Sequence, residues 1–111
     1  METSRKIYRE SELIPFEPTH PGEILKEELE SRGISQRKFA GIIGIQYTAL
    51  NEIVNGKRPI STDFAIMLEA ALDIDAIFWV NLQTRYNMQT ARKNAKLLER
   101  IKQIRNVAAL L

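Results

Sequence analysis

The sequence has no cysteine and only one histidine, His20. These shortages exclude disulfide bonds, thiolate metal ligands and metal sites that need several histidines. No nucleophile lies at a convincing spacing from a histidine and an acid, so we expect neither an enzyme nor a bound cofactor or metal. No apolar run approaches the roughly 18 residues of a membrane span, and the opening METSRKIYRESEL lacks the apolar stretch of a secretory signal. We therefore expect a cytoplasmic protein with no membrane partner.

Aromatic residues are scarce, at 7%, and the formal net charge is only +2 over 111 residues. The chain is long enough for one small domain, and its 44% apolar and 27% charged residues are typical of a globular one. The charge is unevenly distributed, because bases outnumber acids in 35–58 and in 85–105, whereas GEILKEELES is acidic. Local basic patches on a nearly neutral chain indicate nucleic acid or an acidic protein as a partner.

The pattern of apolar residues, caps and helix breakers predicts an all-α fold. We expect helices over 21–32, 36–43, 45–55, 62–72 and 76–86, the first capped by Thr19 or His20. These helices form one domain over residues 19–90. Pro15 and Pro18 break any helix before it, so residues 1–18 are expected to be an arm, either flexible or pinned against a partner or the domain.

Residues 91–111 are predicted to form a C-terminal helical extension. Its apolar residues recur at intervals of four and three, at Leu97, Ile101, Ile104, Ala108 and Leu111. This seam spans about two heptads, which is marginal for a helix standing alone, so the helix must lie on a partner subunit or on its own domain. The high charge of its remaining surface favours the partner, and we expect a homodimer. Trp79 anchors either the core or an interface, and the expected interface residues are Trp79, Leu97, Ile101 and Ile104.

The expected helix over 45–55 has two different faces. At about 100° per residue, one face consists of Ile45, Ala49, Leu50, Ile53 and Val54. The other carries the polar groups of Tyr47, Thr48, Asn51, Glu52 and Asn55. A merely solvated face usually favours lysine, glutamate and arginine. Amides and hydroxyls instead present donors and acceptors in fixed geometry, so this face is a candidate for reading base edges.

The spacing around this helix matches a helix-turn-helix, whose second helix enters the major groove. Counting Gln36 as position one, the pattern is met by Gln36, Phe39, Ala40, Ile43, Gly44, Ile45, Leu50 and Ile53. Ala40 is small where the helices cross, and Gly44 permits a left-handed backbone in the turn. The inward candidates of the first of the two helices are Phe39, Ala40, Ile42 and Ile43.

With these residues in place, the chain resembles the XRE or lambda-repressor-like helix-turn-helix family, a bundle of about five helices. Over roughly residues 19–90 it is also similar to HigA-type antitoxins, in the stretches HPGEILKEELESRGISQRKFA, LNEIVNGKRPIS and IFWVNLQTRY. The resemblance implies an antitoxin that neutralises a small HigB-like RNase toxin. It also implies that a dimer binds an inverted repeat in double-stranded operator DNA and represses its own operon.

Carried over residue by residue, the family pattern implies base contacts by Gln46, Tyr47, Thr48 and Asn51. Gln36 would hold a phosphate and brace the recognition helix. Cations around that helix fix register without reading sequence, and the further phosphate candidates are Arg37, Lys38, Asn55, Lys57 and Arg58. Glu52 does not fit this pattern, because it repels phosphates unless it meets a cytosine amino group or an arginine.

Two other functions stay open. The same DNA-binding residues would serve a stand-alone repressor without a toxin, and the fold would also serve a protein-interaction module that has lost DNA binding. A neighbouring reading frame for a small basic protein, or co-purification with one, identifies an antitoxin. A gel shift on the chain's own promoter region, with a salt series, tests whether DNA is bound at all.

Overall fold

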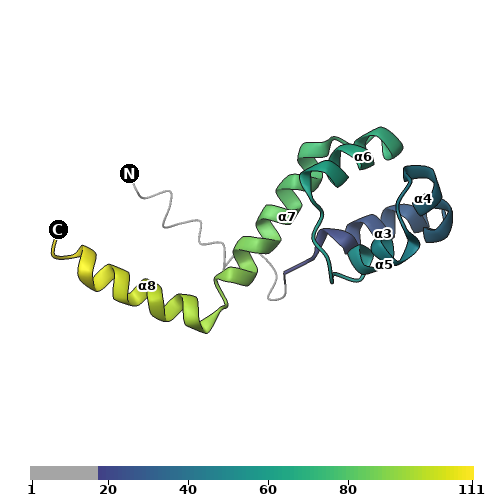
Figure 1. The fold of residues 1–111 in the computed structure, drawn as a ribbon. Coiled ribbons are helices and arrows are strands. Elements are labelled where there is room, and N and C mark those ends of the chain that lie inside the picture. The colour runs from purple at the N-terminus through teal and green to yellow at the C-terminus, as the bar shows by residue number, and fades with distance from the viewer. Residues whose placement is uncertain (1–17) are drawn as a thin grey trace.

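The structure is a computed structural model that describes residues 18–111. Over these residues it contains only helices, namely α3 (Pro21–Ser31), α4 (Gln36–Ile43), α5 (Tyr47–Val54), α6 (Thr62–Leu72), α7 (Ala76–Ala91) and α8 (Ala95–Ala108) (Figure 1). The predicted all-α class and the five helices expected within 19–90 are confirmed, although α7 runs past residue 86. The predicted arm lies outside the described residues except for Pro18, and the division into arm, domain and extension stays a prediction.

Most of these helices begin at a side chain that accepts a hydrogen bond from a backbone amide of the first turn. Ser35 Oγ and Ser61 Oγ each accept from an amide three residues further on, at 3.1 Å. Asn94 caps α8 in the same way, and Asp75 caps α7 by accepting from the amide of Ile77, two residues further on. Such caps satisfy amides that have no partner inside the helix, and each contributes about 1 kcal/mol.

A tight turn joins α4 to α5. Gly44 ends α4 with φ 77°, in the left-handed region where a side chain costs roughly 1–2 kcal/mol. Ile45 then donates its backbone N–H to the Ala40 carbonyl at 3.0 Å, and α5 begins at Tyr47. Gly56 ends α5 in the same left-handed conformation, with φ 76°. The predicted helix-turn-helix is therefore present, although α5 begins at Tyr47 and ends at Val54, inside the expected range of 45–55.

One hydrophobic core lies between α3, α4, α5, α6 and α7, and it includes the motif residues Phe39, Ala40, Leu50 and Ile53. Ile43 and Ile45 pack against it partly buried. Fully burying an aliphatic or phenylalanine side chain contributes roughly 1.5–3 kcal/mol, so this wedge fixes the angle between α4 and α5. The five-helix bundle is therefore confirmed, and α8 is a sixth helix of residues 18–111 that lies outside it.

Trp79 is fully buried in this core, with 0% of its surface exposed. The prediction that it contributes to an interface is therefore wrong, and the alternative of a core anchor is correct. α7 has the core on one side only, where Trp79 and Gln83 are buried. The preceding residues, Ile77 and Phe78, lie on its exposed side.

Ile42 is a second correction, because 58% of its surface is exposed although it was expected to face inward. The core contacts of α4 come from Phe39, Ile43 and Ala40, which span an arc of about 100° around the helix. Ile42 lies roughly 60° outside that arc. Being apolar and next to the buried face was therefore not enough to place it in the core.

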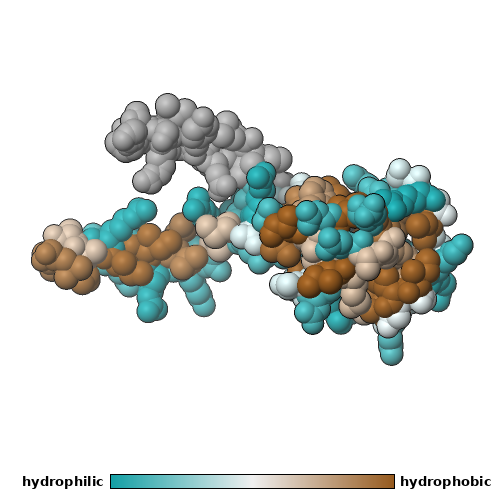
Figure 2. Space-filling view, turned by 90° about the horizontal axis from the view of Figure 1, so that it is seen from above, coloured by the Kyte–Doolittle hydropathy of each residue, from teal (hydrophilic) through white to brown (hydrophobic). Residues whose placement is uncertain are grey.

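α8 projects from the end of α7 away from the bundle (Figure 1), which gives the described chain extents of 57 × 28 × 23 Å. None of its residues is buried, and Figure 2 shows apolar surface along its length. The alternative in which this helix packs on the chain's own domain is not realised among residues 18–111. No helix in this part of the chain is both long and apolar enough to cross a membrane.

Candidate nucleic-acid interface

α5 has the two faces that its sequence predicts. Leu50, Ile53 and Val54 are buried, because α3 and α4 pack against this side of the helix. The opposite face is exposed or half-exposed and consists of Tyr47, Thr48, Asn51, Glu52 and Asn55, and Gln46 is exposed just before the first residue of the helix. The packing of α5 therefore leaves this polar face accessible from outside the bundle, although Tyr47 also packs partly against the core.

The N-terminal end of this polar face is open. Gln46 occupies the N-cap position, but its side chain makes no capping hydrogen bond. Its exposed amide therefore keeps two N–H donors and a carbonyl acceptor for a ligand. Thr48, in the first turn, is exposed beside it.

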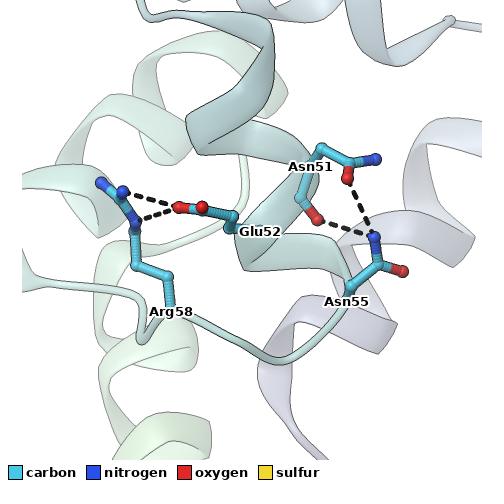
Figure 3. Close-up of polar contacts among 4 residues, drawn as sticks. All are labelled: Asn51, Glu52, Asn55 and Arg58. Carbon is cyan, nitrogen blue, oxygen red and sulfur yellow. Dashed lines mark hydrogen bonds and ion pairs between the residues drawn. The ribbon is translucent and has the colours of Figure 1, made fainter.

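The middle of the polar face is a chain of amides (Figure 3). Asn51 donates from Nδ2 to Gln36 Oε1 at 3.2 Å, which ties α5 to the first turn of α4. Asn55 donates from Nδ2 to Asn51 Oδ1 at 3.2 Å and to the Asn51 backbone carbonyl at 2.9 Å. The bracing contact expected of Gln36 is thus present. It orients the Asn51 amide and still leaves that amide one N–H and one lone pair for another partner.

A second contact joins the same two helices. The Arg37 guanidinium lies over the Tyr47 ring, 4.1 Å from its centroid. Such a cation–π contact contributes about 0.5–1 kcal/mol at an exposed site and holds both side chains in place. Lys38 and Lys57 are also exposed, in the first turn of α4 and in the turn after α5. The predicted phosphate-binding cations therefore border the polar face of α5 at both ends.

From its sequence position, Glu52 fits a DNA-binding face only if it meets a cytosine amino group or an arginine. The structure gives it an arginine partner, Arg58. Arg58 donates to Glu52 Oε1 twice, from Nε at 3.0 Å and from Nη2 at 2.6 Å (Figure 3). Both side chains are about half exposed, at 53% for Arg58 and 47% for Glu52. The pair neutralises the one acid on the polar face and also occupies one of the predicted phosphate-binding arginines.

The C-terminal end of α5 lies against the start of α3. A Cβ on Gly22 would overlap the Ile53 carbonyl oxygen. His20 caps α3 by accepting the Gly22 N–H at Nδ1, at 2.8 Å, and its buried ring lies beside Gly56. Of the two cap candidates, His20 is therefore the correct one. Burial lowers the pKa of His20 below the ordinary value of 6.5, and Glu23 partly offsets this effect.

Sequence reasoning missed Gln83, which positions the segment after α5. Its buried Oε1 accepts the Ile60 backbone N–H at 2.8 Å, and its Nε2 donates to Asn87 Oδ1 at 2.9 Å. Gln83 thereby fixes the end of the stretch that carries Lys57 and Arg58. The available signal was its position four residues after Trp79, where a polar residue interrupts the buried stripe of α7.

The structure therefore gathers the candidate DNA-binding residues on one surface, built from the first turn of α4, the polar face of α5 and the turn after it. It does not bring the remaining candidates there. Leu97, Ile101 and Ile104 lie on α8, which is at the opposite end of the molecule from α4 (Figure 1).

This bundle, with an amide-bearing second helix on its surface, defines a helix-turn-helix protein, and residues 25–79 match the family model for the helix-turn-helix. Antitoxin HigA from Pseudomonas aeruginosa, solved with the higBA promoter, is 41% identical with a TM-score of 0.68, and the match covers 75% of this chain and 92% of that one. An addiction module antidote protein of the HigA family from Coxiella burnetii is 36% identical with a TM-score of 0.68, covering 77% and 95%.

Virulence-associated protein I of Dichelobacter nodosus is 38% identical over 76 residues, which are 68% of this chain and 70% of that protein. These likenesses extend over most of the chain and include the whole helix-turn-helix. The chain belongs to the HigA-type group of the XRE helix-turn-helix family.

Proposed function

We propose that this chain is the antitoxin of a type II toxin–antitoxin pair and that, as a dimer, it binds the operator of its own operon and represses transcription. The observation that carries the DNA-binding part is the braced Asn51 amide, which keeps one donor and one acceptor on an exposed helix face. An adenine edge in the major groove offers the complementary pair. The solved complex of Pseudomonas aeruginosa HigA with the higBA promoter supports the same interpretation.

Each candidate residue of the surface except Glu52 takes one of two roles in this proposal. The base-reading residues are Gln46, Tyr47, Thr48 and Asn51. Phosphates are held by Gln36, Arg37, Lys38, Asn55, Lys57 and Arg58, which fix the register of the protein on the duplex. Two recognition helices, one from each protomer, enter successive major grooves about one helical turn apart, which requires an inverted repeat.

The dimer forms through α8 in this proposal. Leu97 and Ile104 are 39% and 56% exposed on a helix that leaves the bundle, and Ile101 lies between them on the same seam. Pairing two such helices removes this apolar stripe from water. Sedimentation of Ile101→Asp and Ile104→Asp should give monomers, whereas Gln103→Asp, off the seam, should sediment like the wild type. Monomers in all cases, or dimers in all cases, contradict this interface.

The toxin partner is tested by co-expression with the neighbouring gene, followed by affinity purification and sizing of the complex. We expect a stable complex with a small HigB-like RNase and relief of its toxicity. A chain that binds its promoter but captures no such protein is a stand-alone repressor.

DNA binding is tested by fluorescence anisotropy with the chain's own promoter region, a scrambled DNA of equal length and a series of salt concentrations. Lys57→Ala should weaken binding to both DNAs and reduce the slope of log K against log salt by about 0.9 for each phosphate that is no longer neutralised. Lys96→Ala, which removes an exposed cation from α8 at the opposite end of the molecule from α4, is the matched control. A wild-type chain that binds neither DNA is a protein-interaction module instead.

A further inference from the structure

The ion pair between Glu52 and Arg58 is the feature of the polar face that the proposed function does not use. A half-exposed pair of this kind contributes little to the stability of a protein, because water screens its charges. An acid on a DNA-binding face also repels phosphates, so stability alone gives little reason for Glu52 to stand there. Its geometry offers a functional reason.

Arg58 directs both of its hydrogen bonds to one carboxylate oxygen, Oε1. The second oxygen, Oε2, keeps its lone pairs, and the Glu52 side chain, which extends from α5 toward Arg58 (Figure 3), is about half exposed. Arg58 in turn keeps three of its five N–H groups. The pair therefore presents an acceptor and several donors side by side, and its net charge is zero.

This combination fits one base pair better than the others. A carboxylate only accepts hydrogen bonds, and the major-groove donors are the amino groups of cytosine N4 and adenine N6. Adenine carries the N7 acceptor next to its amino group, and N7 repels a carboxylate. Guanine, the partner of cytosine, offers O6 and N7 as acceptors for arginine donors. Glu52 and Arg58 together complement a C·G pair.

Resting on the proposed function, we infer that Glu52 is a specificity-determining residue that reads the cytosine of a C·G pair, and that Arg58 is its positioning residue and donates to the paired guanine. Arg58 then acts mainly in base reading instead of phosphate binding. On unrelated DNA the pair has no complementary bases, so Glu52 repels the backbone and holds Arg58 away from it. The pair thus lowers affinity for wrong sequences and recovers affinity at the operator.

The test selects binding sites from random duplexes with the wild type and with Glu52→Ala. The wild type should select a C·G pair in each half-site, and replacing that pair should weaken binding roughly tenfold. Glu52→Ala should bind both versions equally and keep the other preferences of the wild type. On scrambled DNA it should bind several-fold more tightly, with a salt slope steeper by about 1 per protomer because Arg58 is released.

Glu99→Ala removes an acid from α8, far from α4, and is the matched control for net charge. Glu52→Gln with Arg58→Gln tests the pairing: the double variant should bind scrambled DNA no more tightly than the wild type, because the released cation is gone. Identical selected sites and identical affinity for scrambled DNA in the wild type and Glu52→Ala overturn the inference. A wild type that selects no sequence at all contradicts the proposed function itself.

Discussion

The two ends of α5 are built differently. At the N-terminal end, Gln46 makes no capping hydrogen bond and is exposed. At the C-terminal end, Asn55 is bound to Asn51, Glu52 is paired with Arg58, and the helix is in close contact with Gly22 of α3. One end is open to a ligand, and the other is held in a fixed arrangement by the fold. A recognition helix needs both, because the contacts at the fixed end set the direction in which the open end faces a ligand.

The fixed end depends most on the contact between Gly22 and Ile53. Gly22→Ala should destabilise the fold by roughly 3 kcal/mol or more, because a backbone carbonyl blocks the new methyl group. The matched control is Gly41→Ala on α4, where no other atom lies within 4 Å of the added Cβ. That change should stabilise the chain by about 0.5–1 kcal/mol. Thermal or urea unfolding of both variants measures the difference, and equal stability would contradict the packing of α3 on α5.

The hydrogen bonds that join the side-chain amides of Gln36, Asn51 and Asn55 should have the next largest effect on stability. Asn51→Ala removes the hydrogen bonds to Gln36 and Asn55 and should lower the free energy of unfolding by about 1 kcal/mol, besides weakening promoter binding. Gln36→Ala should produce part of both effects, because it removes the brace and leaves Asn51 in place. An Asn51→Ala variant as stable as the wild type would show that the braced arrangement does not form in solution.

The smallest expected effect is a dependence of the stability on pH, which is caused by His20 beside the C-terminal end of α5. Because burial lowers the pKa of His20, the unfolded chain takes up a proton near pH 6.5 while the folded chain resists it. Stability should therefore fall as the pH drops below 6.5, before carboxylates titrate. His20→Asn keeps a capping side chain and should flatten this slope between about pH 7.5 and 5.5. An unchanged slope would mean that another group is responsible.

Much of the fold followed from local patterns. The caps at Ser35 and Ser61, the turn at Gly44 and the apolar positions of α5 each have one physical interpretation, and each is present. Ile42 and Trp79 could not be placed as reliably, because the angular width of a buried face and the covering of a large ring depend on how neighbouring helices pack.

The candidate surface was predictable as a set of residues but not as a set of interactions. Helical spacing put Asn51, Glu52 and Asn55 on one face. It could not show that Arg58, six residues after Glu52, returns to pair with it, since that depends on the backbone path around Gly56. The hydrogen bond between Ile60 and Gln83 joins residues that are 23 positions apart, so no local pattern in the sequence could predict it.

The central claim is that the open end of α5 reads bases, and Gln46→Ala tests it most directly. Its affinity for the promoter region and for scrambled DNA of equal length should be measured by anisotropy at one salt concentration. We expect promoter binding to weaken by roughly tenfold, as when one base-reading side chain is removed, and scrambled DNA to be bound as by the wild type. An equal weakening on both DNAs, or unchanged affinity for the promoter, would contradict base reading by this helix.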